Sequence, residues 1–358
     1  MIHFHSLQVT EVHKETDDCV SIWFNVPPEL KDTFRFVQGQ SLTVRKEIKG
    51  EEIRRTYSIC TAPFENKLII AVKKVEGGIF STFANNELKK GDVLDVMPPV
   101  GNFNTRLDSA RKKKYIAFAA GSGITPVLSI IKATLYTEPQ SEFTLVFGNR
   151  AKSSIIFKEE IEALKDRYLN RFRIYHILSR EQTDSPLNFG RIDRDKLELM
   201  TDKLIDIKSL DEFFICGPDE MIFCIKNFLI EKGVGNEKIH LELFTIPGEK
   251  KPTADKKIIH KESGPIAKVS VKVDGLLFEF DLPYNQDSIL DAALNKGADL
   301  PYACKGGVCT TCRAKLVEGN VVMDVNWSLE PEELEQGYIL TCQSHPITEK
   351  VLIDFDAK

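Results

Sequence analysis

The amino-acid sequence predicts three domains in one chain: an antiparallel β-barrel, an α/β domain built on a parallel sheet, and a small β-grasp domain. Three observations predict this. The 358 residues exceed what a single hydrophobic core usually serves. The apolar pattern changes after about residue 107 from short alternating runs to buried strands that alternate with helices. A charged, proline-containing stretch then precedes a last segment that holds four of the eight cysteines.

Composition and charge narrow the class of protein. Hydrophobic residues make up 42% and charged residues 28%, as in folded globular chains. No apolar run approaches the roughly 18 residues of a membrane span, and the N-terminus lacks signal-peptide features, so we expect a cytoplasmic protein. Residues 267–358 hold 8 Lys and Arg against 15 Asp and Glu, a net charge of −7, which leaves +2 for residues 1–266. This distribution argues against nucleic-acid binding and predicts that the acidic C-terminal part docks on a more basic partner.

Residues 1–107 are predicted to form the barrel. Short apolar runs with strand-like alternation are broken by Gly, Pro and Asn, as in residues 7–10, 20–24 and 67–72. Arg55, Tyr57 and Ser58 offer a cation, an aromatic ring and a hydroxyl on one strand, and residues 77–82 form a glycine turn that leads into a helix. A flavin dinucleotide needs these groups for its ring system and pyrophosphate. Each motif alone is also typical of a plain strand or a capped turn.

Residues 108–246 are predicted to form the α/β domain, with a parallel sheet covered on both faces. The expected strands are 115–120, 143–147, 172–178 and 213–216, and the expected helices are 126–136, 157–168 and 218–232. A loop from Gly121 to Pro126 follows the first strand. It lacks the common Gly-x-Gly-x-x-Gly pattern, but a glycine loop before a helix still suits a pyrophosphate or a nicotinamide. Cys216-Gly217-Pro218 repeats this arrangement after a later strand, although Cys216 alone also fits a core position.

Residues 247–266 are predicted to be a linker, and residues 267–358 a β-grasp domain. As a flexible coil, the 20-residue linker would span about 25 Å. Strands 269–273 and 276–280 flank Asp274-Gly275, which suits a tight primed turn. A helix over 288–294 follows, capped by Asp287 or Ser288 and ended by Gly297.

The cysteines of the last domain give the most specific pattern in the chain. Their spacing is C-x4-C-x2-C followed by one cysteine after 29 intervening residues, which is the plant-type 2Fe-2S pattern; the four ligands are Cys304, Cys309, Cys312 and Cys342. Gly306 and Gly307 would let backbone N–H groups approach the sulfurs. We expect Cys342 to lie on a strand over 339–343. A structural zinc site is the alternative, but such sites usually have a C-x2-4-C pair at both ends.

These motifs, in this order, give the chain its resemblance to known families. Residues 267–358 resemble plant-type ferredoxins, with Thr310 where that family more often has Gly or Ser. Residues 1–246 resemble the ferredoxin-NADP reductase superfamily. The whole chain is similar to the class with the ferredoxin domain last, that of the phenylacetyl-CoA epoxidase reductases. The resemblance implies an NAD(P)H-dependent oxidoreductase with an FAD domain, an NAD(P) domain and a 2Fe-2S domain.

The resemblance also implies roles for individual residues. The implied FAD contacts are Arg55, Tyr57, Ser58, Val72, Gly78, Ser81 and Thr82. The implied contacts on the nicotinamide side are Gly121, Gly123, Thr125, Pro126, Cys216, Gly217 and Pro218, and Glu242 and Phe244 would lie by the flavin. Among these, the residues implied in the reaction itself are Tyr57, Ser58, Thr125, Cys216 and Glu242.

Three arginines bear on the choice of coenzyme. Arg150 follows an expected strand, Arg180 ends another, and Arg191 lies in Gly190-Arg-Ile192. By resemblance, these three match positions that hold a 2′-phosphate in the superfamily. Because Arg binds phosphate in a bidentate manner, we expect NADPH to be preferred over NADH, although each arginine alone is also typical of a solvated surface.

The expected reaction passes electrons from NADPH to FAD, to the 2Fe-2S cluster and then to an acceptor protein. The resemblance indicates as acceptor a multicomponent di-iron monooxygenase that epoxidises an aromatic CoA thioester, docked near the acidic ferredoxin domain. A ring-hydroxylating oxygenase, a desaturase or a separate ferredoxin would agree with the same motifs. A redox sensor without turnover is a further alternative.

Overall fold

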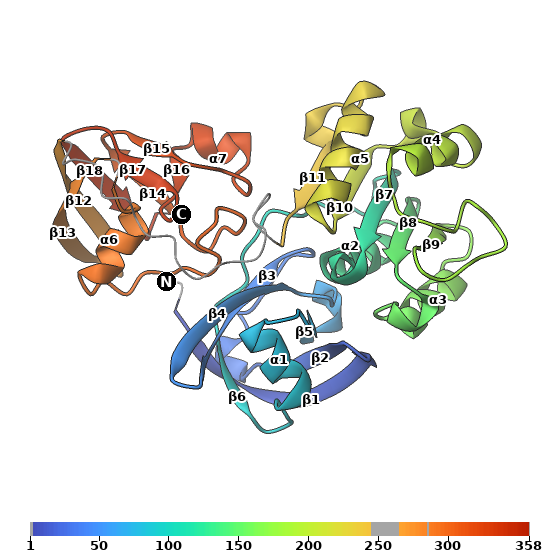
Figure 1. Ribbon diagram of the computed structural model, residues 1–358, viewed down its shortest axis with the longest axis horizontal. Coiled ribbons are helices and arrows are strands. Elements are labelled where there is room, and N and C mark those ends of the chain that lie inside the picture. The colour runs from blue at the N-terminus through green and yellow to red at the C-terminus, as the bar shows by residue number, and fades with distance from the viewer. Residues whose placement is uncertain (1–2, 245–264, 285, 358) are drawn as a thin grey trace. The chain divides into compact units, whose positions relative to one another are not determined.

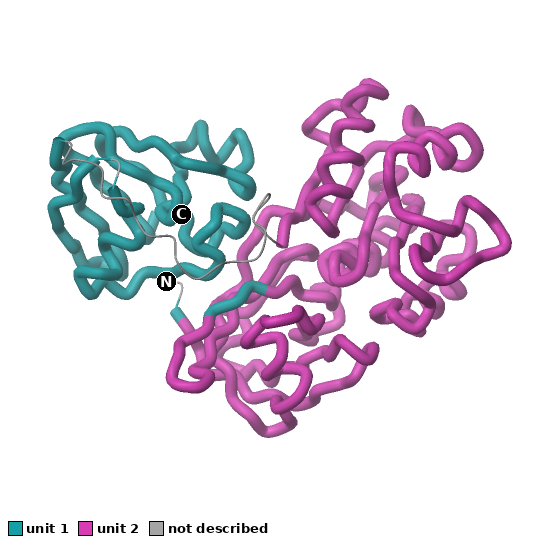
Figure 2. The backbone as a smooth tube through the Cα atoms, in the orientation of Figure 1, with its two compact units in different colours: residues 1–3, 54–56, 245–358 teal, residues 4–53, 57–244 magenta. Residues whose placement is uncertain are grey.

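The computed structural model describes residues 3–244, 265–284 and 286–357 (Figure 1). The chain divides into two compact units (Figure 2). One comprises residues 4–53 and 57–244, and the other comprises residues 1–3, 54–56 and 245–358. The first unit contains most of a barrel domain together with an α/β domain. Most of the second unit is the C-terminal domain.

The barrel domain is a six-stranded antiparallel sheet, as predicted. Its strands are β1 (His5–Thr16), β2 (Cys19–Asn25), β3 (Ser41–Ile48), β4 (Glu51–Ser58), β5 (Leu68–Lys73) and β6 (Val93–Val96), in the order β4-β3-β6-β1-β2-β5. Ile59, directly after β4, bridges to Ile70 in β5 and so joins the two ends of this order. Alternate strand residues fill the core, and helix α1 (Ile79–Asn86) adds Phe80 and Ala84 to it. The short helices η1 (Pro28–Leu30) and η2 (Pro63–Glu65) connect strands.

The α/β domain has a five-stranded parallel sheet in the order β11-β10-β7-β8-β9. The strands are β7 (Lys114–Ala120), β8 (Glu142–Asn149), β9 (Phe172–Leu178), β10 (Glu212–Cys216) and β11 (Ile239–Glu242). The helices are α2 (Ile124–Thr137), α3 (Lys158–Arg167), α4 (Arg194–Lys203) and α5 (Asp219–Glu231), with short η3 (Gly121–Gly123), η4 (Lys152–Ser154), η5 (Ile207–Ser209) and η6 (Asn236–Lys238). Three of the four long helices were predicted. The sequence pattern missed α4 because only Leu197 and Met200 give it apolar contacts with the core.

Helices cover both faces of this sheet. On one face, Phe143, Leu145 and Phe147 of β8 pack with apolar residues of α2 and α3. On the other, Phe118 lies with Leu197 of α4 and residues of α5. This two-sided cover explains why the strands are apolar along their whole length rather than alternating.

The C-terminal domain has a five-stranded sheet in the order β13-β12-β18-β14-β16 and a two-stranded sheet of β15 and β17. These strands are β12 (Ile266–Val273), β13 (Leu276–Pro283), β14 (Arg313–Glu318), β15 (Val321–Met323), β16 (Tyr338–Leu340), β17 (Ser344–Pro346) and β18 (Lys350–Asp354), with helices α6 (Ile289–Asn295) and α7 (Pro331–Glu335). At the predicted turn, Asp274 and Gly275 have φ of 54° and 74°, as a type I′ turn requires. Of the two predicted caps of α6, Ser288 is the one whose hydroxyl accepts the Asp291 N–H.

Two sequence predictions in this part need comment. Residues 247–264 of the predicted linker lie outside the described residues, and Ile266 already begins β12. The strand predicted over 339–343 is wrong beyond Leu340. There β16 ends, and Cys342 lies in the turn that leads to β17. The described residues contain no helix with both the length and the apolar character to cross a membrane.

Candidate redox sites

The β4 residues that are predicted to bind the flavin do not all lie on the same side of the strand, because side chains alternate along it. Arg55 and Tyr57 share one side of the strand, where Arg55 is exposed and Tyr57 is half-buried. The Tyr57 ring packs against Phe80 of α1 with a centroid distance of 5.6 Å. Ser58 is buried, and no group in the described part of the chain hydrogen-bonds its hydroxyl. Buried hydroxyls are nearly always satisfied, so this one suits a hydrogen bond to a bound group such as a flavin.

The turn before α1 is organised by its own side chains. Gly78 is the N-cap of α1, and a Cβ atom there would lie 2.5 Å from the Ser81 hydroxyl. That hydroxyl accepts the Val75 N–H at 3.1 Å and so holds the turn, while Thr82 is half-buried. The N–H groups of the first helical turn are left for an anion. Val72 differs from the other predicted contacts because its side chain is fully buried in the barrel core, which leaves only its backbone for a ligand.

The two glycine motifs of the α/β domain meet. In the loop after β7, Gly121 has a φ of 54° and Thr125 donates its hydroxyl to the Ser122 carbonyl at 3.0 Å. A Cβ atom at Gly123 would lie 2.1 Å from the Cys216 carbonyl oxygen, so this loop and the end of β10 are in backbone contact. Pro126 is buried in the first turn of α2, and Gly217 and Pro218 lead from β10 into α5.

Cys216 and Glu242 are neighbours across β10 and β11. The two residues pair in the parallel register. Cys216 is fully buried in the apolar core, which agrees with the alternative prediction that it is a core residue. Burial raises the pKa of its thiol well above the usual value. Burial also raises the pKa of the Glu242 carboxyl to about 8. The carboxyl is therefore mostly protonated at neutral pH. Phe244, two residues later, is exposed.

The three arginines that are predicted to bind the 2′-phosphate of NADPH lie beyond the carboxyl ends of neighbouring strands. The Arg180 N–H donates to the Arg150 carbonyl at 2.8 Å, just after β9 and β8. Gly190, next to Arg191, donates its N–H to the Leu178 carbonyl at 2.9 Å. All three arginine side chains are exposed. The backbone thus gathers three cations at one edge of the sheet.

The four predicted cluster cysteines come together as two pairs. The Cys304 and Cys309 sulfurs are 3.1 Å apart, and the Cys312 and Cys342 thiols share a hydrogen bond. The Gly306 N–H donates to the Cys304 sulfur at 3.3 Å. The hydrogen bond between the two thiols lowers the pKa of Cys304 and, together with burial, raises the pKa of Cys309 well above its usual value. The hydrogen bonds from the backbone N–H groups at 306 and 308 to Cys304 favour thiolate, the form that binds metal.

This arrangement suits a binuclear cluster. Each iron of a 2Fe-2S cluster takes two thiolates, which is what two cysteine pairs supply. This pairing and the spacing of the four cysteines agree better with 2Fe-2S than with a structural zinc site, which usually has a C-x2-4-C pair at both ends.

Gln343 is a residue that the sequence pattern did not indicate. Its Nε2 donates to the Lys305 carbonyl at 3.0 Å and lies 3.6 Å from the Cys342 sulfur. It thus ties the fourth cysteine to the loop of the first three. Its place directly after Cys342 was the only available signal.

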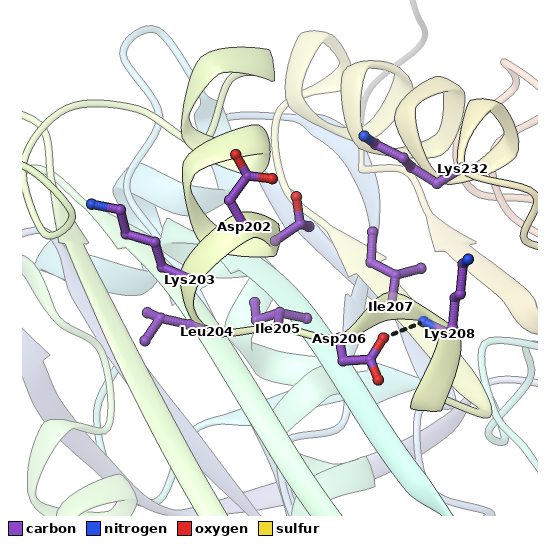
Figure 3. A pocket seen from close by; sticks show the side chains of 9 residues that line it. Asp202, Lys203, Leu204, Ile205, Asp206, Ile207, Lys208 and Lys232 are labelled. Carbon is purple, nitrogen blue, oxygen red and sulfur yellow. Dashed lines mark hydrogen bonds between the residues drawn. The ribbon is translucent and has the colours of Figure 1, made fainter.

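A surface pocket of about 490 Å³ lies away from these sites (Figure 3). It is lined by residues 201–208, from the end of α4 and the segment that leads to β10, and by Lys232 at the end of α5. It lies at the amino end of β10, whereas Gly217 follows the carboxyl end. Its lining mixes the charges of Lys203 and Lys208 with those of Asp202 and Asp206. It contains none of the predicted site residues.

Comparison with known proteins identifies the class to which these sites belong. Residues 6–105 match an oxidoreductase FAD-binding domain, residues 118–227 an oxidoreductase NAD-binding domain, and residues 271–346 a 2Fe-2S iron-sulfur cluster binding domain. The protein is therefore an oxidoreductase with FAD-, NAD- and 2Fe-2S-binding domains in that order, which confirms the predicted domain types and the predicted FAD and 2Fe-2S cofactors.

Full-length relatives define the family. The chain is 47% identical over 358 residues to a component of the 1,2-phenylacetyl-CoA epoxidase of Escherichia coli strain K12, covering 100% of this chain and 99% of that one. It is 34% identical to the ferredoxin reductase component of 3-ketosteroid-9-alpha-monooxygenase of Rhodococcus rhodochrous, covering 98% and 96%. The protein belongs to the family of these three-domain reductases. The structure of phthalate dioxygenase reductase, at 22% identity and a TM-score of 0.57 over 98% of both chains, shares the fold.

Proposed function

We propose that the protein passes electrons from NADPH through FAD and a 2Fe-2S cluster to an oxygenase, as the reductase component of a phenylacetyl-CoA epoxidase system. The observation that carries the proposal is the 47% identity to the Escherichia coli epoxidase component over the whole chain, including all three domains. When bound, FAD accepts hydride and releases single electrons, and the cluster carries one electron at a time.

The residues of the barrel bind and orient the flavin. Tyr57 covers a face of its ring system, and the orphaned Ser58 hydroxyl donates a hydrogen bond to it. Arg55 and the first turn of α1, with Gly78, Ser81 and Thr82, hold its pyrophosphate. Val72 contributes through its backbone, because its side chain belongs to the barrel core.

The α/β domain places the coenzyme. The loop from Gly121 to Pro126 and the turn at Gly217 and Pro218 receive the nicotinamide end, and their backbone contact at Gly123 fixes the floor of the site. Thr125 and the backbone of Cys216, whose side chain belongs to the core, limit its position from two sides. Glu242 holds its proton at neutral pH, so it adds no negative charge where hydride is transferred. Phe244 closes this end next to the flavin.

Two other groups of residues select the coenzyme and hold the cluster. Arg150, Arg180 and Arg191 bind the 2′-phosphate that distinguishes NADPH from NADH. Cys304, Cys309, Cys312 and Cys342 hold the two irons as two pairs. The domains extend over 1–107, 108–246 and 267–358, joined by the linker 247–266.

The acidic C-terminal domain is the docking site for the oxygenase component, in the cytoplasm. Its net charge of −7 favours a partner with a basic surface around the electron entry point. The 34% identity to the 3-ketosteroid-9-alpha-monooxygenase reductase component supports a ring-hydroxylating oxygenase as the second candidate acceptor.

Reconstitution tests the proposal. The cofactor-replete protein is mixed with the oxygenase component of an epoxidase system, phenylacetyl-CoA and NADPH, and product is measured. We expect turnover that requires all three, and its loss in Cys309→Ser. Turnover with a ketosteroid oxygenase and none with the epoxidase would assign the protein to the second candidate.

A further inference from the structure

One stripe of helix α2 joins the α/β domain to the barrel. Thr125, Ser129, Lys132 and Tyr136 are spaced by four, three and four residues, so their side chains lie on the same face of the helix. The last three of them contact the barrel at residues 39 and 61–65. We call these contacts the α2 seam.

Ser129 lies at the centre of the α2 seam. Its hydroxyl donates to the Thr61 carbonyl at 2.6 Å and accepts the Gly39 N–H at 3.3 Å. Ser129 is fully buried, and Thr61 is 3% exposed. Hydrogen bonds that are buried away from water have a fixed geometry. Loss of the Ser129 hydroxyl would leave the Thr61 carbonyl and the Gly39 N–H without this partner.

Two further contacts extend the seam towards solvent. The buried Lys132 ammonium lies 2.9 Å from Glu65 of the barrel and 2.7 Å from Glu160 of α3. The ring of Tyr136 stacks on Phe64 with a centroid distance of 4.0 Å. The α2 seam thus continues over about two helical turns, which restrains rotation between the two domains as well as their distance.

The seam connects the two sides of the proposed hydride transfer. Thr125, in the first turn of α2, precedes Ser129 by four residues on the same face. Ser58, the last residue of β4, precedes Thr61 by three. Hydride transfer requires the reacting atoms to be about 3–3.5 Å apart and aligned. Because donor and acceptor are held by different domains, the contact between the domains belongs to the reaction geometry.

We propose that Ser129 is a positioning residue for hydride transfer, acting through its hydrogen bonds to Thr61 and Gly39. Its side chain is fully buried, so it would contact neither coenzyme nor flavin. Its hydroxyl sets the separation between the glycine loop that receives the nicotinamide and the strand that receives the flavin. This inference rests on the proposed function, because it supposes that NADPH reduces the bound flavin.

Ser141 provides a matched control. It is also fully buried, in the same domain, and its hydroxyl donates to Glu138 at 2.7 Å and accepts the Lys113 N–H at 2.9 Å. Its partners all belong to the α/β domain and lie at the amino ends of the strands. Ser129→Ala and Ser141→Ala therefore remove similar hydrogen bonds, and only the first removes them between domains.

The test compares the two variants in the cofactor-replete protein. Anaerobic rapid mixing with NADPH gives the rate of flavin reduction at saturation and the apparent Kd of the coenzyme. Hydrogen exchange, which does not depend on turnover, follows the Gly39 N–H. For Ser129→Ala we expect flavin reduction roughly tenfold or more slower, with Kd changed less than about twofold, and Gly39 exchange at least about tenfold faster. Ser129→Thr, which keeps the hydroxyl, should recover most of the rate.

Other results would contradict the inference in distinguishable ways. If wild type reduces its flavin and Ser129→Ala does so as fast as Ser141→Ala, Ser129 is only structural. If neither coenzyme reduces wild-type flavin, the proposed function fails and the inference with it. If Ser129→Ala does not fold, Tyr136→Ala tests the same seam at an exposed position. It should slow reduction about twofold to threefold without changing Kd, and an unchanged rate would overturn the proposal.

Discussion

Gly123 packs so closely against Cys216 that a Cβ atom at position 123 would lie 2.1 Å from the Cys216 carbonyl oxygen. This distance is far below van der Waals contact, and the obstacle is backbone rather than a flexible side chain. The glycine is therefore required by the contact between the loop proposed to receive the coenzyme and the end of β10. Two motifs that lie 93 residues apart in the sequence form one surface through this contact.

Gly123→Ala should disturb this surface without emptying the flavin site. The added methyl group forces the loop away from β10, so we expect a loss of about 1–3 kcal/mol in unfolding free energy and flavin reduction by NADPH at least roughly tenfold slower. Urea unfolding and anaerobic rapid mixing measure the two effects. Gly148→Ala is the control, because the closest atom to its Cβ would be the Ile192 side-chain end at 3.2 Å. Equal effects of both substitutions would contradict this account.

Ser58→Ala should affect the protein differently with and without FAD. The unpartnered hydroxyl is a cost in the FAD-free fold, so its removal should leave that form as stable as before or more stable by up to about 1 kcal/mol. The gain in Tm on adding FAD should become smaller, because a hydrogen bond to the flavin is lost. Ser41, whose hydroxyl donates to the Val100 carbonyl, is the control, and Ser41→Ala should destabilise both forms. If FAD raised the Tm of Ser58→Ala as much as that of wild type, the proposed hydrogen bond from Ser58 to the flavin would be contradicted.

Arg180→Ala should distinguish the two coenzymes. Only NADPH carries the 2′-phosphate, so KM for NADPH should rise by roughly tenfold or more while KM for NADH changes less than about twofold. Arg173→Ala, within the strand β9 that precedes Arg180 but ion-paired with Glu142, should change neither. Steady-state reduction of an artificial electron acceptor gives both constants. A rise in both, or in neither, would show that the arginines do not select the coenzyme.

Glu242 should make stability depend on pH in a defined direction. Its folded pKa of about 8 lies above the usual 4.5, so the folded state binds more protons between these values and wild-type stability falls as pH rises through this window. Glu242→Gln removes this contribution to the pH dependence of the unfolding free energy, because Gln does not titrate. The difference in unfolding free energy in favour of the variant should therefore grow from about pH 5 to about pH 8. Urea unfolding at several pH values measures it, and parallel profiles for the two proteins would contradict the assignment.

Much of the fold could be predicted because its local signals are strong. The strands of the parallel sheet are buried on both faces, so β7 to β10 appear as short continuous apolar runs. Asp274-Gly275 favours positive φ at both positions and marks the hairpin directly. Helix α4 was missed because it touches the core through few apolar side chains. The strand at Cys342 was extended too far because the apolar run of β16 does not show where the chain turns.

The candidate sites also contain both features that the sequence could predict and features that it could not. The four cysteines proposed as cluster ligands could be recognised in the sequence because their spacing is a property of the chain itself. Their pairing, Cys304 with Cys309 and Cys312 with Cys342, depends on the fold and could not. Ser129 gave no signal, because its partners belong to another domain and are 68 and 90 residues away.

The central claim is that electrons pass from coenzyme to flavin to cluster within one chain. Anaerobic rapid mixing of the cofactor-replete protein with NADPH tests it directly, because flavin and cluster absorb at different wavelengths. The account predicts that the flavin band decays first and the cluster band second. In Cys309→Ser the second decay should be lost and the first kept. Cys224→Ser, at a cysteine of α5 outside the cluster pairs, should keep both. A wild-type cluster band that stays unchanged while the flavin is reduced would contradict the account.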